Sequence, residues 1–210
     1  LKRQIESTKD LQSVVKTMKA LAAVNIRQYE KAVGSLEEYY SVVEMGMRAV
    51  LRSRPDLPVG ARKAPPGELG VVVFGSDQGM CGQLNDLIVD HALGEIREYE
   101  SRSPSIIAVG ERVGARLEDA GRHYQEVFTV PGSVSGITFH VQELLVRIER
   151  WSAGKGVNRV LLFHSKPLSG ASFQPSTVHL LPIDAMWLRK IREKKWPTRV
   201  LPLFRMNWDT

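Results

Sequence analysis

The 210-residue chain has one cysteine, Cys81, and no hydrophobic run long enough to cross a membrane. Its longest apolar runs, near residues 69 and 159, fall far short of the roughly 18 residues that a membrane helix needs. A single cysteine cannot form an internal disulfide, and no CxxC or HExxH spacing indicates a zinc site. We therefore expect no membrane insertion, no metal site and a reducing, cytoplasmic setting.

Acidic groups are too few to balance the basic ones, so the net charge is +6. Residues 1–31 carry a surplus of four positive charges and residues 184–205 a surplus of five, whereas residues 69–183 are slightly acidic. A basic chain suits nucleic acid, an anionic membrane or an acidic protein partner, and charge alone leaves these three open.

Proline is absent before Pro55, and apolar residues recur every three or four positions in this stretch. These residues, which we call the seam, are Leu11, Val15, Met18, Ala22, Ile26, Tyr29, Val33, Leu36, Tyr40, Val43, Met47 and Val50. Their mean spacing of about 3.55 lies between the period of a straight helix and that of a coiled coil. The pattern predicts one long coiled-coil helix over residues 1–54, on the order of 75 Å long.

A domain of this size cannot cover so long a seam, and the sequence shows no second long helix. We expect residues 184–210 to be a basic segment that leads to a partner helix beyond Thr210. The alternative is an amphipathic helix that folds back on its own body or pairs with a second copy.

The sequence period changes after a Pro- and Gly-rich linker at residues 55–68. Strand-like runs occur at residues 69–75, 105–109, 125–130, 159–164 and 176–181, and helical stretches lie near residues 80–99, 111–120 and 137–151. This alternation predicts that residues 69–183 form a Rossmann-like α/β body with a mostly parallel five-stranded sheet. We expect Trp151 and Phe163 in its core.

The turn after the first strand, FGSDQGMCGQLN at residues 74–85, occupies a place where α/β proteins often bind phosphates. Its glycines do not form GxGxxG, and no P-loop lysine is present. Cys81 lies near the start of a helix and could be a catalytic thiol with His164 or His179 as its base. No local sequence motif supports such a pair. A nucleotide-binding α/β enzyme therefore stays an alternative.

A basic coiled-coil nucleic-acid binder is a second alternative, suggested by the two charged ends of the chain. The early basic residues share their helix with a full apolar seam and lack interleaved aromatic side chains for base stacking. This alternative predicts association with DNA or RNA that depends steeply on salt.

Three segments resemble one known family, in the correct order. Residues 1–27, the turn SDQGMCGQLN (residues 76–85) and SKPLSGASFQPSTVHLLPI (residues 165–183) are similar to the N-terminal helix, the SDRGLCGGLN turn and the sheet-closing segment of the gamma subunit of F-type ATP synthase. Gln78, Met80 and Gln83 replace the arginine, leucine and second glycine of that turn. These departures indicate a divergent member and leave the coupling ion, proton or sodium, open.

The resemblance implies a central-stalk rotor subunit that has no catalytic site and no cofactor. It implies alpha and beta subunits, the epsilon subunit and the membrane c-ring as partners, in a complex on the cytoplasmic face of a bacterial membrane. The shaft would turn inside the alpha/beta ring and couple ion flow to ATP synthesis or hydrolysis. Acidic protein then becomes the favoured partner of the basic ends, in place of nucleic acid.

The resemblance also implies which residues contact the beta subunit. On the long helix they are Lys16, Met18, Lys19 and Arg27, which would meet an acidic segment of beta through electrostatic attraction. In the turn they are Asp77, Gln78 and Cys81. Without the resemblance, Met18 is interpreted as an ordinary seam residue.

Overall fold

A computed structural model describes residues 2–54, 67–99, 104–154, 156–169 and 172–196. These residues fall into two compact units. The first comprises residues 2–54, 132–137 and 194–196, and the second comprises residues 67–131 and 138–193. Most of the expected linker, residues 55–66, and the end of the basic segment, residues 197–210, lie outside the described residues.

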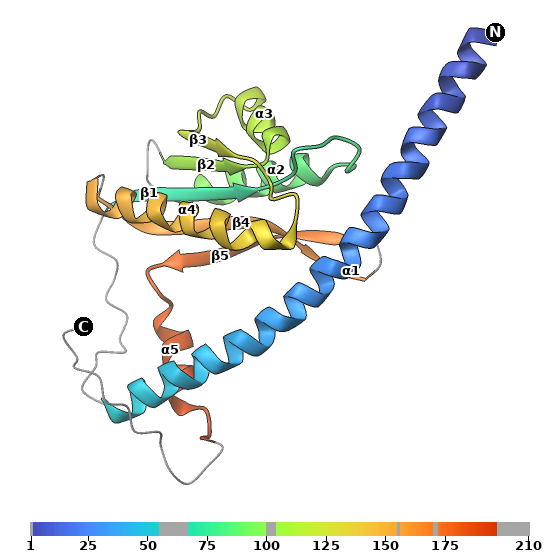
Figure 1. The fold of residues 1–210 in the computed structure, drawn as a ribbon. Helices are drawn as coiled ribbons and strands as arrows, with labels where there is room; N and C mark the ends of the chain where they lie inside the picture. Colours follow the sequence, from blue (N-terminus) through green and yellow to red (C-terminus); the bar gives the residue numbers. More distant parts are fainter. Residues whose placement is uncertain (1, 55–66, 100–103, 155, 170–171, 197–210) are drawn as a thin grey trace. The chain divides into compact units, whose positions relative to one another are not determined.

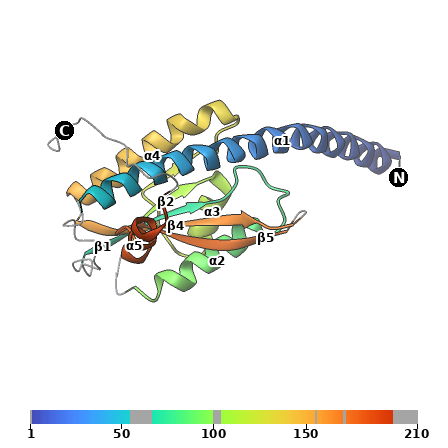
Figure 2. The same ribbon diagram turned by 90° about the horizontal axis from the view of Figure 1, so that it is seen from below.

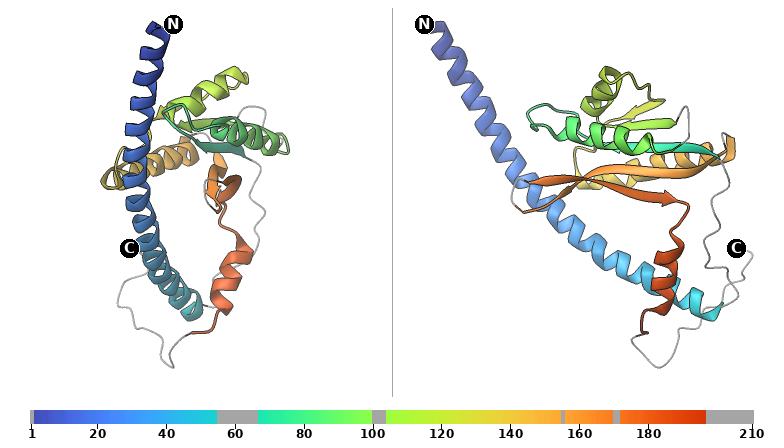
Figure 3. Two further views of the ribbon diagram at one scale, coloured as in Figure 1. Left: turned by 90° about the vertical axis from the view of Figure 1, so that its right-hand side faces the viewer. Right: turned by 180° about the vertical axis from the view of Figure 1, so that it is seen from behind.

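The long N-terminal helix is confirmed: α1 runs without interruption over Lys2–Ser53, 52 residues (Figures 1 and 3). Thr8 and Thr17 donate hydrogen bonds from their hydroxyls to the carbonyls four residues earlier, at 2.8 and 3.0 Å. These back-bonds satisfy polar side chains inside the helix. The seam faces solvent along most of α1, since Leu11 is 64% exposed and Leu36 57%.

The sheet of the second unit has five strands in the order β3-β2-β1-β4-β5 (Figure 1). The strands are β1 (Glu68–Phe74), β2 (Ser105–Val109), β3 (Glu126–Phe128), β4 (Val157–Pro167) and β5 (Phe173–Leu181). β1 pairs in parallel with β2 and β4, and β2 pairs in parallel with β3, whereas β4 and β5 are antiparallel. The sequence-based prediction of a mostly parallel five-stranded sheet is therefore confirmed.

Helices cover both faces of this sheet (Figure 2). Helices α2 (Leu84–Ile96) and α3 (Glu111–Asp119) pack on one face, around Phe163, and α4 (Val134–Gly154) packs on the other through Trp151. Both aromatic side chains are buried, as the sequence predicted. The sequence of β1 is a continuous apolar run because its side chains are buried alternately on the two faces of the sheet.

The helix after the first strand and the basic segment both differ from the sequence-based prediction. The helix expected near residue 80 begins at Leu84, because residues 75–83 form a turn. The basic segment contains a helix that we did not foresee, α5 (Ala185–Glu193). Asp184 caps it by accepting a hydrogen bond from the backbone N–H of Met186 at 2.8 Å. This capping aspartate was the signal in the sequence that pointed to α5.

Candidate partner-binding site

The segment predicted to contact a partner, which comprises the turn at residues 75–83 and the first two residues of α2, lies at the carboxyl edge of the parallel strands. Gly75 donates a backbone hydrogen bond to Val109 at the end of β2 (2.8 Å), and Gly110 donates one to Phe128 at the end of β3 (2.7 Å). Gly75 is needed because a Cβ there would collide with the side chains of Asn85 and Val113. The turn is thus closely packed on the end of the sheet.

Asp77 connects the turn to two other segments of the body. Its carboxylate accepts hydrogen bonds from the backbone N–H of Glu111, the first residue of α3 (3.0 Å), and from that of Val130 (2.8 Å). A carboxylate at a helix N-terminus is favoured by the helix dipole as well as by the hydrogen bond. Both carboxylate oxygens are therefore engaged within the body.

Cys81 belongs to a small polar network inside the turn. Its Sγ lies 3.3 Å from Ser76 Oγ and accepts a hydrogen bond from Asn85 Nδ2 at 3.4 Å. Asn85 also donates to Ser76 Oγ (2.9 Å) and accepts from the Ser76 N–H (3.0 Å). The hydrogen-bond partners of the thiol are thus neutral groups of the turn and of Asn85 at the start of α2, and neither His164 nor His179 is among them. This geometry gives no support to a catalytic thiol.

The tip of the turn, residues 78–80, is exposed. Gln78 and Gly79 are exposed, and Met80 is exposed by 77%. Met80 also has a positive φ of 59°, a backbone conformation that non-glycine residues seldom adopt. The turn therefore presents an amide and a thioether outward, while Asp77 and Cys81 hold it together from within.

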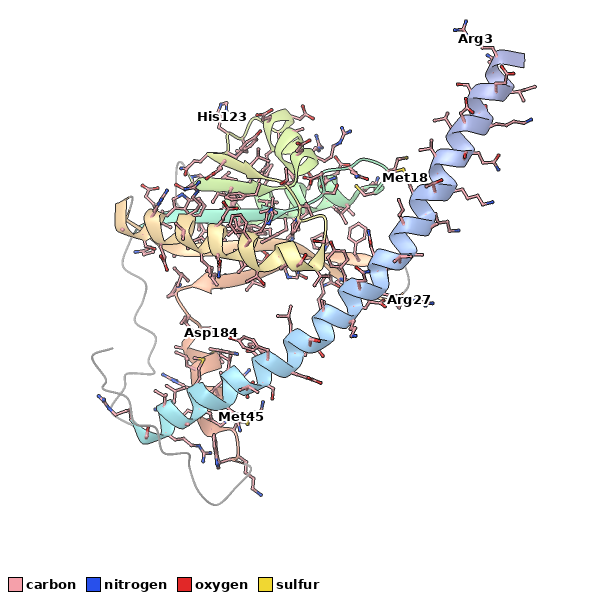
Figure 4. The ribbon with its side chains drawn as sticks, in the orientation of Figure 1. Arg3, Met18, Arg27, Met45, His123 and Asp184 are labelled. Atoms are coloured by element: carbon pink, nitrogen blue, oxygen red, sulfur yellow. The ribbon has the colours of Figure 1, made fainter. Side chains whose placement is uncertain are left out.

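The four predicted contact residues of the long helix divide between two faces of α1, and Figure 4 labels one residue of each face, Met18 and Arg27. At roughly 100° per residue, Lys16, Lys19 and Arg27 fall within about 80° of one another, whereas Met18 falls among the seam residues. The three basic side chains are exposed, and Met18 is partly exposed. These residues belong to the first unit, whereas the turn belongs to the second.

The partners of Asp77 could not have been found by reading the sequence. Glu111 and Val130 lie 34 and 53 residues further along the chain, and they contribute backbone N–H groups that carry no sequence signature. Within the described residues, no group of three or more His, Cys, Asp or Glu side chains is arranged to hold a metal ion. No helix in that part of the chain is long and apolar enough to span a membrane.

Comparison with known proteins gives a match over most of the chain. A family model described as ATP synthase matches residues 1–204. The ATP synthase gamma chain of Pelotomaculum thermopropionicum is 28% identical over 88% of this chain and 64% of its own length. That of Desulforamulus reducens is 28% identical over 94% of this chain and 68% of its own length.

The chain thus spans about two thirds of the length of these relatives. Among solved structures, the fold resembles one from the central stalk and c-ring of Tetrahymena thermophila mitochondrial ATP synthase. Its TM-score is 0.53 at 19% identity, with 86% of this chain and 79% of that chain covered. This likeness supports the fold.

Proposed function

The chain belongs to the ATP synthase gamma family, and from this premise we propose that it is a central-stalk rotor subunit of an F-type ATP synthase. It carries no catalytic site in this proposal. It couples ion flow through a membrane sector to ATP synthesis or hydrolysis by turning inside a ring of alpha and beta subunits. The single observation that carries the proposal is the family match, which extends over both α1 and the α/β body.

The exposed seam of α1 supports this function independently. Large apolar side chains that are more than half exposed occur along it from Leu11 to Tyr40. An isolated helix in water gains nothing from such a stripe, because its apolar area stays hydrated. When other subunits enclose the helix, they bury the seam, and its apolar area then contributes to the stability of the complex.

The proposed partners are the alpha and beta subunits around α1, and the epsilon subunit and membrane c-ring beside the α/β body. The chain then works as a peripheral part of a membrane-bound complex, on the cytoplasmic face of a bacterial membrane. Its net charge of +6 suits acidic protein surfaces.

Two contacts with the beta subunit are proposed on α1. Lys16, Lys19 and Arg27, which share one face of the helix, attract an acidic segment of beta and guide it along the shaft. Met18 lies in the seam, where its flexible thioether side chain suits a contact that changes as the shaft turns. A methionine tolerates such repacking better than a β-branched side chain does.

In the turn we propose a division of labour. Gln78, at the exposed tip, meets the beta subunit directly. Asp77 and Cys81 support that contact by holding the turn in place through their hydrogen bonds. Because a side-chain amide carries no charge, this contact is less dependent on salt than the contacts of the basic residues on α1.

Assembly with purified alpha and beta subunits tests the proposed function. We expect the chain to co-purify with them as an ATPase, and a double variant Lys16→Glu, Lys19→Glu to weaken assembly at low salt. The matched control Arg122→Glu reverses a basic charge in the α/β body and leaves assembly unchanged. Failure of the wild-type chain to form an ATPase with the two subunits would overturn the proposal.

A further inference from the structure

Within the first unit, several polar contacts connect the C-terminal end of α1 to residues 194–196. Lys194 Nζ and Arg48 Nη2 both donate to Glu44 Oε1, at 2.7 and 2.8 Å. Arg52 Nη2 donates to the Lys194 carbonyl at 2.9 Å, and Arg48 Nη1 to the Lys195 carbonyl at 3.3 Å. The Arg48 guanidinium also lies 5.9 Å from the centre of the Trp196 ring.

The arrangement of these contacts suits the transmission of a twisting force. Glu44, Arg48 and Arg52 are spaced four residues apart and therefore lie on the same face of α1, on three successive turns. All three side chains contact the same short segment. Two of the acceptors are backbone carbonyls, so the arginines hold the main chain at Lys194 and Lys195. The contacts join three turns of α1 to both a side chain and the main chain of the segment, so rotation of α1 about its axis or sliding along it would stretch at least one of them beyond hydrogen-bond distance.

Burial distinguishes this cluster from an ordinary surface ion pair. The side chains of Arg48 and Glu44 are only 7% and 15% exposed, although that of Lys194 is 60% exposed. The hydrogen bonds from Lys194 and Arg48 lower the pKa of the Glu44 carboxyl, so it stays ionised near neutral pH. A charged, hydrogen-bonded acceptor shared by two cations is a strong connection for its size.

We propose that Glu44, Arg48 and Lys194 form a joint that prevents α1 from turning or sliding against residues 194–196 while the subunit transmits torque. The inference rests on the rotor function proposed above. The joint positions α1 and takes no part in ATP chemistry. Without the joint, ATP is therefore still hydrolysed, but fewer ions are transported for each ATP.

The test uses the assembled ATP synthase of the source organism in sealed vesicles. Lys194→Met keeps the aliphatic stem of a mostly exposed side chain, so it removes the ion pair without disturbing the fold. Arg48→Met removes both of its hydrogen bonds, and Lys194→Arg restores a cation. ATPase rate is measured beside ATP-driven ion transport against an imposed gradient, with a pH-sensitive dye for protons and radioactive sodium for sodium ions.

We expect ATPase rates to stay within about twofold of wild type, because no catalytic group is touched. The number of ions transported per ATP against the gradient falls about threefold in Lys194→Met, which corresponds to the free energy of one partly screened ion pair. The fall is larger in Arg48→Met. Lys194→Arg restores transport. The control Arg116→Met, which breaks the ion pair of Arg116 with Asp86 (2.6 Å) in the α/β body, leaves the ratio unchanged. An unchanged ratio in both joint variants, or a proportional fall of ATPase and transport, overturns the joint.

Amide hydrogen exchange in the free chain measures the joint separately from the rotor function. Glu44→Gln and Lys194→Met should each speed exchange at residues 195 and 196, and the double variant should add little to either. Unchanged exchange in these variants overturns the joint whatever the complex does. Failure of the wild-type chain to assemble an ATPase overturns the rotor function instead.

Discussion

Between Leu11 and Tyr40, the seam of the long helix α1 is mostly exposed, whereas the core of the α/β body is buried. In the body, Val71, Ile88 and Phe163 are fully buried. On α1, Leu11, Val33 and Leu36 are more than half exposed. The body therefore obtains its stability from its own core, whereas the apolar side chains of α1 contribute to stability only when another surface covers them. This difference indicates that the function depends on the surface that covers the seam of α1.

The largest test of this comparison removes a core side chain from the body. Phe163→Ala deletes a ring that is 0% exposed, and we expect it to lower the free energy of unfolding by about 3–5 kcal/mol. Urea titration of the full chain, followed by tryptophan fluorescence, measures the change. A loss below about 1 kcal/mol would show that the body does not depend on its own core, and the comparison would fail.

A second prediction concerns the packing of the candidate turn on the body. Gly75→Ala places a Cβ against Asn85 and Val113, so we expect a loss of about 1–3 kcal/mol. The control Gly94→Ala lies within α2 with nothing within 4 Å of the added Cβ, and it should stabilise by about 0.5–1 kcal/mol. Equal effects of the two variants in thermal melts would contradict a closely packed turn.

Much of the fold could be predicted because each unit repeats a local pattern. The seam spacing predicted α1, and strand-like runs alternating with helical stretches predicted the sheet. Helix α5 was missed because its nine residues give too short a pattern, although Asp184 marks its start. The order of the strands rests on pairing between distant segments, which apolar periodicity by itself does not encode.

The candidate site was less predictable than the fold. The resemblance indicated Asp77 and Cys81 as contact residues, but it did not reveal that their side chains bond within the turn and to the N-terminus of α3. Glu44 and Arg48 read in the sequence as a common helical pair, four residues apart. Their partner Lys194 lies 150 residues from Glu44, and no local pattern could connect them.

The joint between α1 and residues 194–196 gives a third, smaller effect that depends on pH. The pKa of Glu44 is lowered from 4.5 by its hydrogen bonds to Lys194 and Arg48, so the folded state favours the ionised carboxylate. The resulting stability, about 1 kcal/mol or less, is fully present above pH 4.5 and is lost as the pH falls through the lowered value.

Circular dichroism melts of wild type and Glu44→Gln between pH 3 and 7 test this dependence. We expect the wild type to be more stable at neutral pH and the two curves to converge in acid. A Glu37→Gln control removes an exposed carboxyl of α1 and should follow the wild type. A difference between wild type and Glu44→Gln that grows as the pH falls would contradict the assigned contacts.

The smallest effect in the free chain concerns the seam itself. Leu36→Ala removes a side chain that is 57% exposed, and alanine is an equally good helix former, so the free chain should change by less than about 0.5 kcal/mol. In an assembled complex the same leucine would be enclosed, and truncation would cost about 2 kcal/mol or more. Thermal melts of the free chain and of the complex with alpha and beta subunits measure both values. Equal, small losses in the two states would mean that the seam near Leu36 stays uncovered, and the contrast between α1 and the body would then have no bearing on function.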